Sequence, residues 1–160
     1  MRRLHNRDWG FETNCFVCEP SNDQGLRIPF FVDGDRVVAR FSLDDEFSGA
    51  PKYVHGGVVL AVLDEAMAWA SIAIAGKVAV TKQTSTEFAR PVRVGLEQEV
   101  EAFAEAVDAT IATRALLRDD RGNLCASAHA TFVPLGPAQL HDATGAEPSA
   151  TITQMLADER

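Results

Sequence analysis

Residues 55–75 read HGGVVLAVLDEAMAWASIAIA, and this stretch decides the fold of the chain. Apolar residues occupy nearly every position from residue 58 onward, so the pattern predicts a helix without a polar face, interrupted only by Asp64 and Glu65. Two adjacent carboxylates at bilayer depth would each cost several kcal/mol, roughly 2.5 or more on insertion, which argues against a membrane span. Residues 58–75 are therefore predicted to form one long helix buried in a protein core.

Strand patterns lie on both sides of this helix. Residues 36–43 alternate apolar and polar side chains before it, and four further stretches follow it in succession: residues 78–88, 96–104, 111–118 and 124–134. A parallel βαβ architecture would need several helices, whereas only one is available. The sequence therefore predicts an α+β fold in which a curled antiparallel β-sheet wraps one long central helix.

Length and composition allow one domain with a real core, because the chain has 160 residues and 46% of them are hydrophobic. We expect a single domain over residues 1–135, including an N-terminal extension over residues 1–30. The polar residues 136–160 are expected to form a C-terminal tail with room for a short helix.

Charge and cysteine content restrict the partners and the compartment. The formal net charge of −8 leaves no basic cluster of the kind that binds nucleic acid. No apolar stretch follows the basic start of the chain, and three cysteines are too few and odd in number for a disulfide framework. We therefore expect a cytoplasmic chain with neither a nucleic-acid partner nor a membrane partner.

The entrance of the predicted helix carries the residues that point to chemistry. Gly56 and Gly57 let another group approach the backbone N–H donors at the positive end of the helix dipole, which suits an oxyanion. A tight turn capped by His55 would explain the same residues. Asp64 lies seven residues past Gly57, on the same side of the helix but about 10.5 Å farther along it. If the Gly57 N–H and Asp64 act on one carbonyl carbon, they must therefore come from two chains of a dimer.

The two acids in the middle of the helix are expected to differ in role. An acid at an apolar position must be hydrogen-bonded, paired or raised in pKa, and the last two conditions are typical of working acids and bases. A structural, paired Asp64 is the alternative. Glu65 is turned about 100° from Asp64 around the helix, so we expect it to be paired or to face solvent.

The motif of His55, Gly56 and Gly57, with an acid nine residues after the histidine, resembles hotdog-fold acyl-CoA thioesterases, specifically the PaaI-like and THEM4-like branch. Residues 81–95, TKQTSTEFARPVRVG, are similar to that family's strand after the helix. Residues 15–26, CFVCEPSNDQGL, resemble an N-terminal element found in part of the branch.

This resemblance implies a hotdog fold and the hydrolysis of an acyl-CoA thioester to a free acid and coenzyme A, with no metal and no cofactor. It implies that Gly57 supplies the oxyanion N–H and that Asp64 of the partner chain is the general base or nucleophile. His55 would orient the entry loop, and Thr81 would hold the water or the acid. A homodimer, or a dimer of dimers, is expected, because edge strands need covering and the two half-sites need different chains.

Three cations are expected near the mouth of this site, together with Gly56 as part of the substrate-binding entrance. Lys52, Arg90 and Arg93 are the basic residues nearest the motif, and the phosphates of coenzyme A bind such side chains. Surface arginines usually face water, which is the alternative for each of them. Some relatives carry an amide side chain six residues before the histidine, where this chain has Gly49.

The pair Cys15-x-x-Cys18 has the spacing of half a zinc site, but no second pair completes it. His5 and Cys125 stand at arbitrary spacings from the pair, so we expect reduced, largely buried thiols rather than a metal centre.

Two other functions stay open at this level. The same fold can serve as a non-catalytic module that senses acyl-CoA, because fold does not determine function. It can also serve as an enoyl-CoA hydratase or dehydratase, which would need a histidine–acid pair, but His129 and His141 lie outside the motif. The sequence does not reveal the identity of the acyl group.

Overall fold

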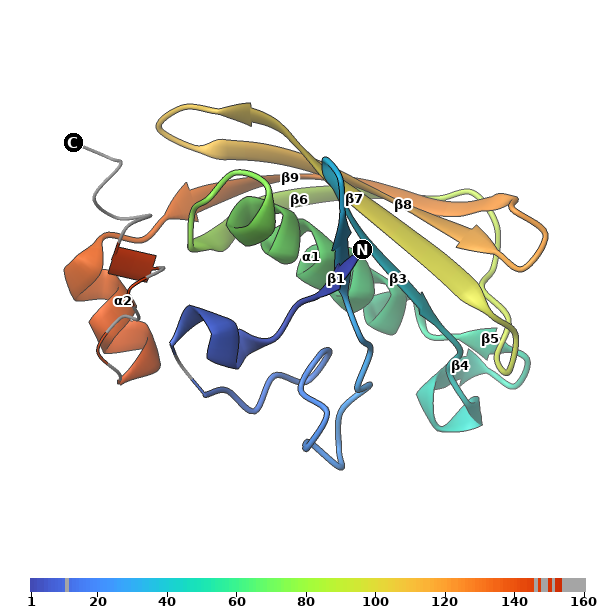
Figure 1. Ribbon diagram of the computed structural model, residues 1–160. Helices are drawn as coiled ribbons and strands as arrows, with labels where there is room; N and C mark the ends of the chain where they lie inside the picture. The colour runs from blue at the N-terminus through green and yellow to red at the C-terminus, as the bar shows by residue number, and fades with distance from the viewer. Residues whose placement is uncertain (11, 146, 148–149, 151, 154–160) are drawn as a thin grey trace.

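The computed structural model describes residues 1–10, 12–145, 147, 150 and 152–153. Its main feature is a seven-stranded antiparallel sheet with the strand order β1-β2-β3-β7-β8-β9-β6 (Figure 1). The strands are β1 (Arg2–Arg3), β2 (Phe31–Asp33), β3 (Arg36–Phe41), β6 (Ala79–Phe88), β7 (Gln98–Val107), β8 (Ile111–Asp119) and β9 (Leu124–Pro134). A separate pair is formed by β4 (Ser48–Ala50) and β5 (Tyr53–Val54).

Helix α1 (Gly56–Ala73) lies across one face of this curved sheet and contacts β3, β6, β7, β8 and β9. The sequence-based prediction of one long helix wrapped by an antiparallel sheet is therefore confirmed. The helix begins two residues earlier than predicted, because Gly56 and Gly57 adopt helical conformation and do not form a turn before it. Among the described helices, α1 alone is long and apolar enough to cross a bilayer by length and composition, and here it is the core helix.

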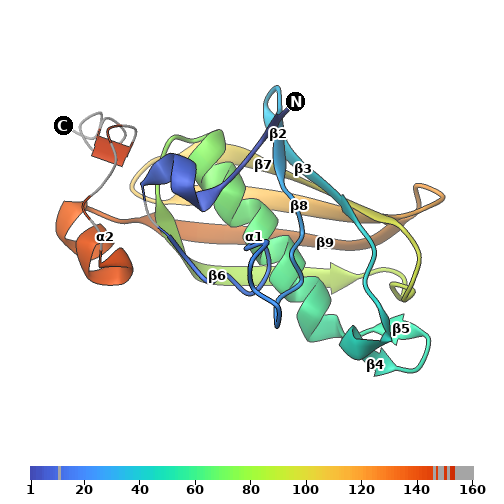
Figure 2. The ribbon, with the colours of Figure 1, turned by 60° about the horizontal axis from the view of Figure 1, so that its bottom comes forward.

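The face of α1 that points away from the sheet is covered by the N-terminal part of the chain (Figure 2). This part contains the 3-10 helix η1 (Asn6–Trp9), and its buried side chains join the same core as α1. They are Leu4, Trp9, Val17, Ile28 and Phe30. Cover on two sides explains why α1 can do without a polar face.

Strand β6 follows α1 in the chain but pairs with β9, so it forms one edge of the sheet. All of its residues are exposed or half-buried, and the side chains of Val80 and Phe88 are about half exposed, at 49% and 53%. An edge strand presents unpaired N–H and C=O groups that can pair with another chain. β6 is therefore a long edge strand that is open to a partner, whereas the other edge, β1, has only two residues.

Two further short helices belong to the described structure. The 3-10 helix η2 (Asp45–Phe47) precedes β4, and α2 (Pro137–Thr144) follows β9 and buries Leu140. α2 lies within the segment expected to be a tail, while residues 154–160 lie outside the described residues. The predicted domain limits stay predictions.

Truncation of a core side chain of α1 should destabilise the protein strongly. Leu63 is 0% exposed, and Leu63→Ala is expected to lower the free energy of unfolding by about 2–5 kcal/mol, through lost burial and the cavity left behind. Urea unfolding followed by circular dichroism at fixed protein concentration measures this change. Leu96→Ala, at a side chain that is 39% exposed, is the matched control. An equal loss in both variants would contradict the placement of α1 in the core.

Candidate active site at the start and middle of the central helix

The first turn of α1 is organised by His55, the N-cap residue. Its backbone is extended, at φ −60° and ψ 135°, and its carbonyl oxygen accepts hydrogen bonds from the N–H groups of Val58 and Val59 at 2.9 and 3.1 Å. The imidazole Nδ1 accepts a further hydrogen bond from the Gly57 N–H at 2.9 Å. The His55 side chain therefore caps the first turn of the helix, and its implied role in orienting the entry loop stays a prediction.

Two glycines give the His55 ring its space. A Cβ at Gly57 would lie 3.1 Å from Nδ1 of the ring, and a Cβ at Gly49 would lie 3.2 Å from its Cδ2. Both distances are shorter than ordinary carbon contacts. The amide side chain that some relatives carry six residues before the histidine would therefore press against His55 in this chain.

The Gly56 N–H is the donor that the helix entry leaves available. It has no hydrogen-bond acceptor among the residues that the structure describes, whereas the Gly57 N–H is already bonded to His55. A Cβ at Gly56 would meet the ring of Phe88 at 3.8 Å, which is an ordinary contact. The geometry thus differs from the expectation that Gly57 offers the free donor, because the imidazole occupies that N–H.

The acid in the middle of the helix is held by the edge strand. The Thr81 hydroxyl donates a hydrogen bond to Asp64 Oδ1 at 2.9 Å, so the structure brings together the two residues that the sequence analysis linked. The strand register shifts between Thr81 and Gln83, and such a bulge re-aims the side chains next to it. Asp64 is half-buried and Thr81 is exposed, so water can reach the pair.

One chain cannot bring the donor and the acid to a single carbon. Gly56 and Asp64 are eight residues apart in α1, which corresponds to about 12 Å along the axis. The two groups therefore lie at separate places on each chain, Gly56 at the start of α1 beside Phe88 and Asp64 in its middle beside Thr81.

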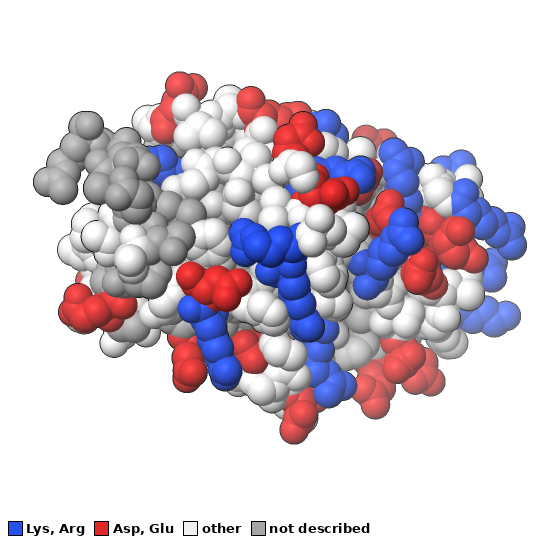
Figure 3. Space-filling view, viewed as in Figure 1, with Lys and Arg blue, Asp and Glu red and all other residues white. Residues whose placement is uncertain are grey.

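The predicted cations lie on the loops next to the helix entry. Arg90 and Arg93 line one cavity of about 290 Å³, together with Arg121, which the sequence analysis missed because it stands in the distant β8–β9 hairpin. Lys52 does not line this cavity; its carbonyl oxygen accepts a hydrogen bond from the N–H of Val94 at 3.2 Å, next to Arg93 in the chain. Basic side chains gather among acidic ones at this end of the molecule (Figure 3). The cavity itself includes Asp119 and Asp120.

Glu65 points to a different environment from Asp64. The Cys15 thiol donates a hydrogen bond to Glu65 Oε1 at 3.4 Å, so this acid is paired, as expected from its rotation around the helix. Burial is the main cause that raises the pKa of Glu65 to about 8. The contact between the Cys15 and Cys18 side chains is the main cause that lowers the pKa of Cys15 and raises the pKa of Cys18. The sequence contains no sign of this contact, because Cys15 and Glu65 are 50 residues apart.

Comparison with known families gives one match to this part of the chain. The family model of the thioesterase superfamily matches residues 52–126, a range that includes α1, Thr81 and the predicted cations. Among curated proteins, no match was found.

Solved structures share the fold. A crystal structure of a thioesterase superfamily protein is 28% identical with a TM-score of 0.71, and the match covers 75% of this chain and 60% of that one. This chain thus spans less than two thirds of that protein. A Streptococcus mutans protein bound to acetyl CoA is 18% identical (TM-score 0.63; 68% of this chain, 89% of that one). The PaaI protein of E. coli, from the phenylacetic acid degradation operon, is 19% identical (TM-score 0.63; 68% and 80%). These findings confirm the hotdog fold and the resemblance to hotdog-fold thioesterases.

Loss of the imidazole cap should weaken the start of α1. His55→Ala removes the acceptor of the Gly57 N–H and is expected to lower the free energy of unfolding by about 1 kcal/mol, as for other lost caps. His55→Asn, whose side-chain oxygen can accept the same bond, should restore most of this loss. Chemical denaturation of the three proteins measures the effect, and a His55→Ala variant as stable as the parent would show that the cap does not contribute.

Proposed function

Since the chain is a hotdog-fold protein whose residues 52–126 match the family model of the thioesterase superfamily, we propose that it hydrolyses acyl-CoA thioesters to a free acid and coenzyme A. The observation that supports this proposal most is the Asp64–Thr81 pair, an accessible carboxylate held in place midway along a buried helix. The Streptococcus mutans relative, bound to acetyl CoA, supports the class of substrate.

The proposed working unit is a homodimer joined through β6. Thr81, beside Asp64, lies near the beginning of this strand, and Phe88, beside Gly56, lies at its end. If the β6 strands of two chains pair antiparallel, the beginning of one strand lies next to the end of the other. This pairing would bring Gly56 of one chain toward Asp64 of its partner and would cover the exposed Val80 and Phe88. Two such dimers could assemble further into a tetramer.

In the proposed reaction, the thioester carbonyl oxygen binds the Gly56 N–H at the positive end of α1. The partner's Asp64, oriented by Thr81, takes a proton from a water molecule, and that water attacks the carbonyl carbon. The carbon–sulfur bond then breaks, and the coenzyme A thiolate leaves and is protonated. Attack by the carboxylate itself, followed by hydrolysis of the anhydride, would give the same products.

The contribution of each of these groups to the reaction rate is known to an order of magnitude. One oxyanion donor is typically worth about 100- to 1,000-fold in rate, and a positioned base about 100- to 10,000-fold. Lys52, Arg90 and Arg93 are proposed to hold the phosphates of coenzyme A, because these groups favour Arg and Lys partners.

The hydratase alternative finds little support in the placement of the histidines. His129 lies 3.8 Å from Glu105 and is exposed on β9, between the buried residues Ala128 and Ala130, so it faces away from α1. His141 lies on α2, near Glu147. Neither histidine is placed beside Asp64.

Replacement of the proposed base should stop turnover without loss of binding. Asp64→Asn is expected to lower kcat at least about 100-fold while acyl-CoA binding is retained. Release of free thiol from a panel of acyl-CoAs measures turnover, and Asp35→Asn, at an exposed turn, is the matched control. Normal hydrolysis by Asp64→Asn would rule out its role, and binding without turnover in the parent protein would favour the sensor.

The contribution of two chains to one site can be tested by mixing variants. Gly56→Pro removes the proposed donor N–H at a position where proline is tolerated, because Gly56 is the first helical residue and His55 is already extended. Gly56→Ala keeps the N–H and serves as the control. Gly56→Pro and Asp64→Asn should each be inactive.

A hybrid dimer of these two variants contains one intact site, so random mixing should restore about a quarter of the parent activity. Co-expression with two different affinity tags allows the hybrid to be isolated and measured. A verified hybrid with no activity would contradict the shared site.

A further inference from the structure

A second cluster of reactive side chains lies on a neighbouring face of α1, turned about 100° around the helix from Asp64. Cys15 Sγ, Cys18 Sγ and a carboxylate oxygen of Glu65 all lie within 4.8 Å of one another, and all three residues are half-buried. The two cysteines come from the N-terminal part of the chain, and Glu65 comes from the middle of the core helix. Tertiary contact alone therefore assembles this group.

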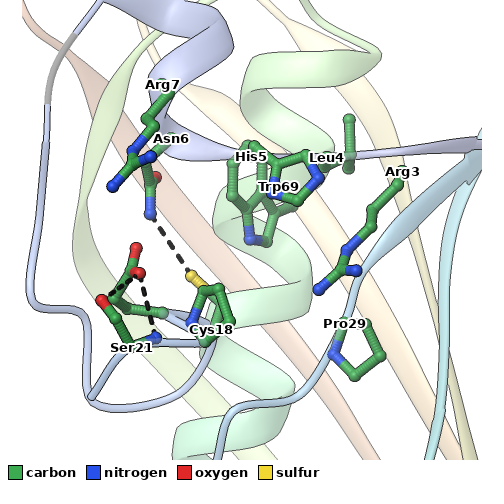
Figure 4. Close-up of a pocket in the computed structure, with 11 residues that line it drawn as sticks. Arg3, Leu4, His5, Asn6, Arg7, Cys18, Ser21, Pro29 and Trp69 are labelled. Carbon is green, nitrogen blue, oxygen red and sulfur yellow. Dashed lines mark hydrogen bonds between the residues drawn. The ribbon is translucent and has the colours of Figure 1, made fainter.

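N–H donors lie beside both sulfur atoms. The backbone N–H groups of Val17 and Cys18 point at Cys15 Sγ, at 3.4 and 3.5 Å. The Asn6 amide donates to Cys18 Sγ at 3.5 Å, as Figure 4 shows. Hydrogen bonds from N–H donors stabilise a negatively charged sulfur and orient it, which is the role of outer-shell groups around metal-bound cysteine.

A cation is needed if these three acidic groups are to ionise together. Like charges at this separation oppose one another, and burial adds to the cost. Within the described part of the chain, neither Lys nor Arg forms an ion pair with Glu65. A divalent ion at the centre of the cluster would neutralise most of the charge.

The spacing agrees with tetrahedral zinc. Ligand bonds of about 2.3 Å to sulfur and about 2.0 Å to oxygen place these two atoms about 3.5 Å apart at a tetrahedral angle. Cys15 Sγ and Glu65 Oε1 are 3.4 Å apart. Two thiolates and one carboxylate also form a donor set that zinc prefers over magnesium or calcium.

We propose that Cys15, Cys18 and Glu65 bind one zinc ion that ties the N-terminal part of the chain to α1. The fourth position is open to water. Cavities of about 290 and 390 Å³ adjoin the cluster, the first lined by Cys15 and Glu65 and the second by Cys18. Trp69 lines both, and its indole N–H is buried without an acceptor among the described residues (Figure 4).

The proposed role is structural and independent of the proposed thioesterase reaction. Glu65 is turned about 100° from Asp64 around the helix, so the ion would not reach the Asp64–Thr81 pair. Bound metal adds its binding free energy to the stability of the fold. Removal of zinc should therefore lower Tm before it affects the chemistry at Asp64.

Metal content and cobalt substitution test this proposal on the whole protein. Protein purified under reducing conditions is expected to contain one zinc per chain by elemental analysis. The metal-free protein titrated with Co²⁺ should saturate at one equivalent and give a sulfur-to-cobalt charge-transfer band together with strong tetrahedral absorption in the visible range. Metal-free protein that shows no saturable cobalt–thiolate band would overturn the proposal, and so would iron in place of zinc.

Matched variants assign the ligands. Cys15→Ser and Cys18→Ser should abolish the cobalt–thiolate spectrum, whereas Cys125→Ser, at a buried thiol outside the cluster, should keep it. Glu65→Gln should weaken zinc affinity at least about tenfold, because loss of even an outer-shell partner has an effect of this size. If the cysteine variants do not fold, the cobalt spectrum of the parent chain and the zinc affinity of Glu65→Gln still decide the matter. Unchanged affinity in Glu65→Gln, or loss of the spectrum in folded Cys125→Ser, would refute the assignment.

Discussion

Burial of α1 on two sides is the constraint on which the rest of the structure depends. The helix has 18 residues, and the sheet covers one face of it while the N-terminal part of the chain covers another. Val62, Leu63, Ala66, Met67 and Ala70 are fully buried. Because these side chains hold the helix in one position, every functional group on α1 has a defined place and direction.

The rigid helix also separates the two groups that hydrolysis would need together. Gly56 lies at its start, with its N–H free among the described residues, and Asp64 lies about 12 Å farther along the axis. In β6, the neighbours of these two groups stand in the reverse order along the chain. Thr81, beside Asp64, lies near the beginning of the strand, and Phe88, beside Gly56, lies at its end. The proposed two-fold dimer through this edge would bring the two groups together, which a single chain does not do.

Two neighbouring carboxylates have different chemistry because the helix turns them into different surroundings. Asp64 faces the accessible edge strand and accepts a hydrogen bond from Thr81. Glu65 faces the N-terminal part of the chain, where burial raises its pKa to about 8 and two thiols lie beside it. The first environment suits an acid that exchanges protons with water, and the second suits a structural metal ligand.

Local pattern in the sequence was sufficient to predict the central helix and the antiparallel strands, because apolar periodicity depends on residues close together in the chain. The resemblance to a known family implied that Thr81 holds the water or the acid, and the structure shows its hydroxyl bonded to Asp64. The cytoplasmic location stays a prediction. Tertiary structure decided which glycine N–H is free. The His55 ring is rotated so that its Nδ1 accepts a hydrogen bond from the Gly57 N–H. Tertiary structure also decided that Glu65 meets Cys15 and Cys18, because contacts across 50 residues arise only when the chain packs and no spacing encodes them.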